Sequence, residues 1–214
     1  MKEPSVQTNP VFQRPRRLVL ACGALIHEMM ALLNQNPEIK ADTKVHCLPA
    51  KLHNTPQFIG QRVDEYLAEN AHQYDEILIG YGDCGTGGEL DRVLDKYNAQ
   101  RIPGAHCYEF FAGSEVFFDL AEQELGTLYL TDYLVKNFQR LIIEGLGIDR
   151  YPELFEAYFK HYKKIVYLAQ TDNTELQRMA KEYADDFGWV YEYRFTDIGG
   201  LKPILGANIG LEVA

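Results

Sequence analysis

The chain has 214 residues, of which 46% are hydrophobic and 24% charged. This is the composition of an ordinary folded protein. Lys and Arg number 21 and Asp and Glu 31, so the formal charge is −10, which argues against non-specific nucleic-acid binding. No apolar run approaches the roughly 20 residues of a membrane span, and the first 17 residues lack the apolar core of a secretory signal. We therefore expect a cytoplasmic protein with neither nucleic acid nor membrane as a partner.

Strand-length apolar runs alternate with amphipathic stretches in the first half. In one of these stretches Ile59, Val63 and Leu67 recur at helical spacing. The strands predicted here cover residues 18–21, 44–48, 76–81 and 100–103. The predicted helices cover residues 24–34, 57–69, 87–97 and 107–124, the last with a break at Gly113.

The second half is more helical. Thr174 and Gln177 form a capping box at the start of one helix, which ends at Gly188. The predicted helices cover residues 132–144, 152–162 and 174–187, and the strands 127–130, 164–168 and 189–195. The segment after Gly199 is rich in Gly and Pro, and we predict no regular structure for it.

Strands that alternate with helices predict an α/β fold, with a mainly parallel sheet and helices on both faces. We expect a flexible arm over residues 1–16, one domain over 17–201 and a tail over 202–214. Residues 17–125 and 126–201 can alternatively form two Rossmann-like lobes.

Cys or His follows each of the first four predicted strands. Cys22, His53, Cys84 and the adjacent His106 and Cys107 all come shortly after a strand. Ligands of open parallel sheets bind at the carboxyl ends of the strands, so we expect these side chains to meet there. In a reducing compartment, such cysteines are more often free, metal-bound or catalytic than disulfide-bonded. A single cysteine at a strand end is usually a packing residue, and Cys47, inside a strand, is interpreted as core.

Three thiols and an imidazole suit zinc, which binds Cys and His tetrahedrally. We predict a metal site of Cys22, Cys84 and Cys107, with His53 as the fourth ligand or as an acid/base. Iron or an iron–sulfur cluster is also compatible with three thiolates. Glu28 and His106 are the candidate catalytic acids or bases. A solvated helix glutamate is an equally good interpretation of Glu28, whereas Glu109 is placed to hydrogen-bond a metal ligand.

Two further segments are candidates for binding a small-molecule ligand. Gly82, Gly85 and Gly87 belong to a glycine-rich loop that leads into a helix, where backbone N–H groups can bind an anion. Alternatively, the glycines only let Cys84 approach a ligand. Asp172 follows the strand at 164–168 and either faces the site or serves as a helix N-terminal acid.

Several short motifs resemble the family known as domain of unknown function 1638. They are Leu20-Ala-Cys-Gly-Ala-Leu25, Leu52-His-Asn-Thr-Pro56, Tyr81-Gly-Asp-Cys-Gly85, Ile102-Pro-Gly-Ala-His-Cys-Tyr108, Tyr129-Leu-Thr-Asp132 and Val166-Tyr-Leu-Ala-Gln-Thr-Asp172. The resemblance extends from about Arg17 to Leu201. The family pattern includes the positions of Cys22, His53, Cys84, His106 and Cys107, but other branches place an Asp between the last two.

Members that resemble this chain accompany corrinoid-dependent methyltransferases for methylated amines. The resemblance thus implies a role in one-carbon metabolism, with a corrinoid protein or methyltransferase as partner. Zinc held by thiolates can activate a thiol acceptor for methylation, which fits the predicted ligands. Two other hypotheses stay open: a non-catalytic module that binds a cofactor or partner, and a metal-free enzyme. In the enzyme, Cys84 or Cys107 is the nucleophile and His106 or His53 the base.

Overall fold

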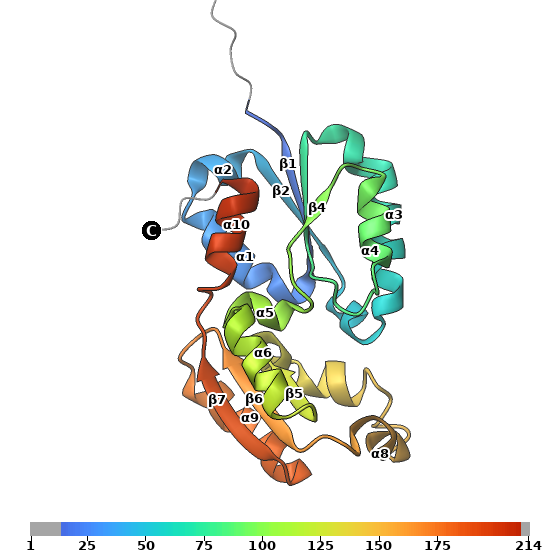
Figure 1. Cartoon of the computed structure of the whole chain (residues 1–214), viewed down its shortest axis with the longest axis vertical. Coiled ribbons are helices and arrows are strands. Elements are labelled where there is room, and N and C mark those ends of the chain that lie inside the picture. Colours follow the sequence, from blue (N-terminus) through green and yellow to red (C-terminus); the bar gives the residue numbers. More distant parts are fainter. Residues whose placement is uncertain (1–13, 211–214) are drawn as a thin grey trace, which may run out of the picture.

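The computed structural model describes residues 14–210, so most of the predicted arm and the last four residues lie outside the described residues. The chain forms two parallel sheets, one in each of two lobes (Figure 1). The first has the strand order β2-β1-β3-β4, and the second β5-β6-β7. The first sheet contains β1 (Arg17–Cys22), β2 (Thr43–Leu48), β3 (Glu76–Gly80) and β4 (Gln100–Arg101). The second contains β5 (Thr127–Leu130), β6 (Lys164–Ala169) and β7 (Val190–Phe195).

The central strands are apolar because both of their faces are covered. Leu18 to Ala21 of β1 are at most 1% exposed, and Leu20 pairs with His46 on one side and Ile79 on the other. In the first lobe, α3 and α4 cover one face of the sheet, and α1 and α10 lie on the other (Figure 1). The predicted α/β class, with mainly parallel sheets and helices, is confirmed.

The helices of the first lobe bury the predicted apolar stripes. Met29, Leu32 and Leu33 of α1 are buried, and Ile59, Val63 and Leu67 of α3 face the same core. The elements are η1 (Gly23–Leu25), α1 (Ile26–Asn34), α2 (Pro37–Ala41), η2 (Ala50–Asn54), η3 (Pro56–Phe58), α3 (Ile59–Asn70), η4 (Ala71–Gln73), α4 (Glu89–Asp95), α5 (Cys107–Ala112) and α6 (Ser114–Gln123). The predicted break at Gly113 separates α5 from α6.

One predicted helix of the second lobe is interrupted. Residues 132–144 divide into α7 (Asp132–Lys136) and a π-helical turn, η5 (Gln139–Ile143). The Asn137 side chain donates to the Tyr133 carbonyl, 2.8 Å away, and such a side-chain bond competes with regular helix geometry. The other helices are α8 (Glu153–Phe159) and α9 (Thr174–Phe187).

The segment after Gly199 differs from the predicted tail, because it contains the helix α10 (Leu201–Ile209). Leu201 and Leu205 are at most 1% exposed and belong to the core of the first lobe. The chain therefore leaves the first lobe after α5 and returns to it at its end (Figure 1). The sequence pattern conceals this helix because Gly200, Pro203 and Gly206 are all poor helix formers.

The carboxyl ends of the two sheets face each other. The turn η1 directly follows β1, and it packs against α7, which directly follows β5. Asn54, beyond the end of β2, donates its Nδ2–H to the carbonyl of Leu141 in the second lobe, 2.5 Å away. The edge where the sequence predicts chemistry thus lies near the junction of the lobes. Among the described residues, no helix is both long and apolar enough to span a bilayer.

Candidate functional site

A cavity of about 280 Å³ lies at the carboxyl edge of the first sheet. We call it the thiol cavity, because three of the four cysteines line it. Its polar lining consists of Cys22, His53, Tyr81, Cys84, His106, Cys107 and Tyr108. Leu25, Pro56, Ile59, Gly80 and Gly85 complete the wall. The structure thus brings together all five Cys and His residues that the strand ends predict, and leaves Cys47 outside the lining.

Cys22 lies at the end of β1 and is 8% exposed. Burial raises the pKa of its thiol to about 11, although a hydrogen bond from the Ala24 backbone N–H favours the thiolate. The neighbouring Tyr81 hydroxyl is buried, and its interaction with the Cys22 thiol favours the thiolate of Cys22. Cys22 is therefore a protonated thiol unless a cation is present beside it.

Cys84 and Cys107 form a close pair because their two loops are joined by backbone hydrogen bonds. The Asp83 N–H donates to the Gly104 carbonyl at 2.9 Å, and the Cys84 N–H to the Ala105 carbonyl at 2.8 Å. Hydrogen bonding from the Cys107 thiol lowers the pKa of Cys84, and the same contact, with burial, raises the pKa of Cys107. One thiolate shared by two sulfurs, centred on Cys84, is the favoured ionised form.

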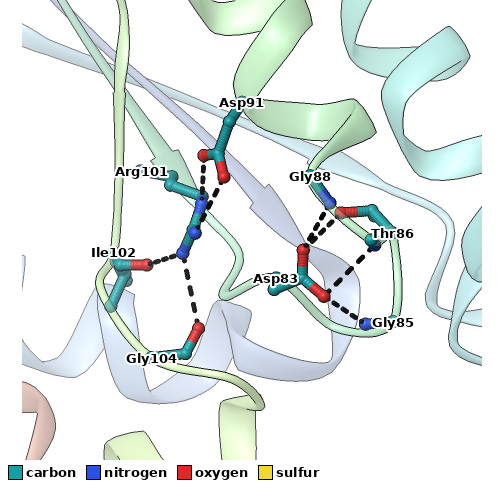
Figure 2. A network of polar contacts seen from close by, with 9 residues as sticks. Asp83, Gly85, Thr86, Gly88, Asp91, Arg101, Ile102 and Gly104 are labelled. Atoms are coloured by element: carbon teal, nitrogen blue, oxygen red, sulfur yellow. Dashed lines mark hydrogen bonds and ion pairs between the residues drawn. The ribbon is translucent and has the colours of Figure 1, made fainter.

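The loop that carries Cys84 is closed by Asp83 (Figure 2). One carboxylate oxygen accepts from the Gly88 N–H at 3.0 Å and the Thr86 hydroxyl at 2.9 Å. The other accepts from the N–H groups of Gly85 and Gly87 at 3.2 and 3.3 Å. Burial opposes ionisation of Asp83, but these hydrogen bonds outweigh it and hold the pKa below its ordinary value.

This closure determines what the glycine-rich loop can bind. The amides of Gly85, Gly87 and Gly88 already donate to Asp83, so an external anion would have to displace that carboxylate. Cys84 itself has φ +49°, a conformation that non-glycine residues rarely adopt. The anion-binding role of Gly82, Gly85 and Gly87 stays a prediction, and the geometry favours the alternative in which the loop presents Cys84.

An ion pair supports the second loop (Figure 2). Arg101 donates to both oxygens of Asp91, at 2.6 and 3.1 Å. It also donates to the carbonyls of Ile102 and Gly104, at 3.1 and 3.3 Å. Because Gly104 also accepts from Asp83, the guanidinium links the two cysteine loops indirectly. Arg101 directly precedes the motif at residues 102–108, but its partner Asp91 belongs to no motif, so the sequence does not predict this ion pair.

Glu109 holds the loop from the other side. Its carboxylate is 8% exposed and accepts from the Ala105 N–H at 2.8 Å and the Ser114 hydroxyl at 2.6 Å. We expected it to hydrogen-bond a metal ligand. It instead positions the backbone two residues before Cys107, so it orients that side chain only through the main chain.

The two imidazoles lie against aromatic rings. His53 Nε2 is 3.4 Å from the Tyr108 hydroxyl, and the His106 ring contacts Tyr108 and Phe117. Burial lowers the pKa of His53, with a further contribution from His106, and both effects favour the neutral ring. A neutral imidazole can accept a proton or ligate a metal. Tyr108 lies in an aromatic-rich segment with Phe110 and Phe111, and its place in the cavity wall shows only in the structure.

Four predicted site residues do not line the thiol cavity: Gly82 and Gly87 of the glycine-rich loop, and Glu28 and Asp172. Glu28 is half-buried on α1, and one of its carboxylate oxygens has no hydrogen-bond partner. Burial raises the pKa of Glu28, while Asp132 and Lys136 of the second lobe act on it in opposite directions. Asp172 is exposed and accepts from Gln177 at 3.1 Å, near the start of α9. Their catalytic and ligand-binding roles stay predictions.

The present arrangement is not a formed metal centre. Between residues 14 and 210, no group of three His, Cys, Asp or Glu side chains could hold a metal ion as they stand. What the cavity contains is a paired Cys84 and Cys107, a protonated Cys22 and two imidazoles around one space. This donor set matches zinc in its chemistry, but binding would require the side chains to rotate.

These features define a two-lobed α/β protein with a thiol- and imidazole-lined cavity at a sheet edge. The chain belongs to the family described as "Protein of unknown function (DUF1638)", whose model matches residues 47–205. No curated protein matches the chain.

Proposed function

We propose that the thiol cavity is a zinc–thiolate site that serves corrinoid-linked methyl transfer. Cys22, Cys84 and Cys107 would hold the metal, and His53 would be the fourth ligand or an acid/base. The observation that carries the proposal is that three thiols from three separate strand ends line one cavity with two imidazoles. Packing alone gives no reason for three cysteines to converge on the same space.

Backbone donors add support. N–H groups of Ala24, Gly82 and Cys107 point at the sulfurs of Cys22 and Cys84. Such hydrogen bonds stabilise thiolates, which are the form that binds a metal. They also fix the sulfur positions, as the outer contacts of metal sites commonly do. The corrinoid connection is supported only by the family resemblance of the motifs around these residues.

The proposed reaction moves a methyl group between a corrinoid partner and a small thiol. The acceptor sulfur forms a bond to the methyl carbon, the cobalt–carbon bond breaks, and its electron pair stays on the partner's cobalt. His106 lines the cavity and would take the proton that the acceptor thiol loses. A zinc ion would supply the means to keep that acceptor deprotonated at neutral pH.

Elemental analysis of protein purified anaerobically without a histidine tag tests the metal. We expect about one zinc per chain in the wild type, because three thiolates and an imidazole complete a tetrahedral site. Cys84→Ser should lose it, and Cys47→Ser, which changes a thiol outside the cavity lining, should keep it. Iron in place of zinc would redirect the proposal to iron chemistry. Absence of metal from the wild type would refute the metal site.

A second function is favoured by the pKa of Cys84, which hydrogen bonding from Cys107 lowers without any metal. Here Cys84 is the nucleophile of a metal-free enzyme and His106 or His53 the base. Thiol reactivity before and after a chelator distinguishes the two functions. Thiolates released from a metal become more reactive, whereas a nucleophile activated by its neighbours changes little.

A further inference from the structure

The thiol cavity has an unusual charge environment for a small-molecule site. Among the described residues that line it, none is Lys, Arg, Asp or Glu. Its titratable groups are three thiols, two imidazoles and two phenols, and the rest of the wall is apolar or glycine. At about 280 Å³, it is also at or below the lower limit of the 300–1,000 Å³ that drug-sized ligands occupy.

Arg101, the cation that links the two cysteine loops, is already engaged. Arg101 is paired with Asp91 and donates to two carbonyls. The amides of the glycine-rich loop donate to Asp83, so they do not form an anion-binding concavity (Figure 2). An anionic ligand would therefore meet no fixed positive charge in the described lining, where only the two imidazoles can take up a proton.

A carboxylate buried without a partner loses several kcal/mol of hydration, whereas a neutral amide of the same size loses much less. From the absence of cationic lining and the engagement of the surrounding donors, we propose that the thiol cavity admits small molecules without negative charge and excludes their carboxylate analogues. This inference deepens the proposed function, since it names the acceptor class as small uncharged thiols. It rests on the cavity being the reaction site.

Paired alkylating reagents test the inference without any methyl transfer. Iodoacetamide and iodoacetate have nearly the same size and differ in charge. Alkylation of each cysteine in the chelator-treated full-length protein is followed by mass spectrometry. For each thiol, the ratio of the two rate constants does not depend on the fraction of the thiol that is ionised, because both reagents attack the same thiolate. Cys47, half-buried and outside the cavity lining, is the internal reference.

We expect the amide-to-acid ratio at the cavity thiols to exceed that at Cys47 by roughly thirty-fold, since the acid must be buried unpaired. Ratios within about three-fold of each other would overturn the inference. So would failure of both reagents to reach Cys22, Cys84 and Cys107 while Cys47 reacts completely, because the cavity would then admit neither class. These outcomes are independent of metal content, so they are separable from failure of the proposed function.

A charge-insertion variant provides a second measurement. Pro56→Arg places a cation on a half-buried part of the cavity wall, and should lower the ratio at the cavity thiols toward that of Cys47. The matched control is Pro49→Arg at an exposed position outside the lining, which should leave the ratio unchanged. An equal effect of both variants would show that general surface charge, and not the cavity lining, governs entry.

Discussion

The Asp83 carboxylate lies 3.0 Å from the backbone N–H of Gly88 and closes the loop that carries Cys84. Together with bonds to Gly85, Thr86 and Gly87, this contact holds Cys84 in its positive-φ conformation beside Cys107. The geometry of the thiol pair therefore depends on a carboxylate that does not line the cavity.

Replacing this carboxylate should loosen the loop. We expect Asp83→Ala to lower the free energy of unfolding by about 1–2 kcal/mol at pH 7, because several amides lose their acceptor. Urea denaturation measures the change, and Thr86→Val, which removes one of the same bonds, should cost less than about 1 kcal/mol. A smaller loss in Asp83→Ala than in Thr86→Val would contradict this role.

The same contact predicts a pH dependence. The folded-state pKa of Asp83 lies below its unfolded value, so its stabilisation is present above the unfolded pKa of about 3.9. It is lost as the pH falls through the lower folded pKa. The stability difference between wild type and Asp83→Ala should thus shrink in urea titrations below about pH 4. A difference that stays constant down to pH 2 would exclude ionisation as its source.

Gly104 lies so close to Glu109 that a larger residue does not fit there. Its φ is +120°, and an added Cβ would lie 2.7 Å from the Glu109 Oε2. We expect Gly104→Ala to destabilise the protein by more than about 2 kcal/mol, since backbone strain and a buried clash add together. Gly188→Ala, at a left-handed helix end with φ +68° and ψ +28° and no atom within 4 Å of the added Cβ, should cost only about 1 kcal/mol. Thermal unfolding should rank the two variants in this order.

The pH dependence of the Glu28 contribution to stability should be opposite to that of Asp83. Burial raises the folded-state pKa of Glu28, so its contribution to stability is greatest below the unfolded pKa and declines as the pH rises through the folded pKa. Glu28→Gln should therefore stabilise the protein slightly at pH 7, by less than about 1 kcal/mol, and have no such effect at pH 4. Guanidinium denaturation at both pH values tests this. Glu69→Gln, at an exposed position, is the control that should show no pH-dependent gain.

A substitution at Leu205 tests how strongly α10 stabilises the first lobe. Leu205 is 1% exposed in that lobe's core, so Leu205→Ala should cost about 2–4 kcal/mol. Hydrogen exchange should report the loss in β1 and α1. Lys202→Ala, on the same helix but half-buried, should change stability by less than about 0.5 kcal/mol. Unchanged protection in β1 would show that α10 is only loosely attached.

Periodicity predicted the strands and most helices because their apolar faces are regular. The run from Leu18 to Ala21 and the stripe of Ile59, Val63 and Leu67 point to the observed core. Periodicity missed α10, whose Gly and Pro content hides a helix that tertiary packing stabilises. It also gave no sign of the π-helical turn after Asn137, which depends on local hydrogen bonding.

Part of the site could be predicted from the sequence because of the topology of the sheet. In a parallel sheet all carboxyl ends meet at one edge, so Cys22, Cys84 and Cys107 could be expected together from the strand positions alone. The backbone contacts that support the site could not. Arg101 acts through loop carbonyls, and Glu109, although singled out in the sequence, acts through the Ala105 amide; such backbone contacts have no residue pattern. Tyr81 could have been suspected, because it directly follows β3 and precedes Cys84 by three residues.

The return of α10 to the first lobe makes the second lobe an insertion within the fold of the first. During synthesis, the whole of the second lobe emerges before Leu201 and Leu205 can complete the first core. The lobe that begins the chain is therefore the later of the two to be completed, which reverses the usual amino-to-carboxyl order of domain folding. Until α10 is made, the apolar surface that it covers has to be kept from aggregating.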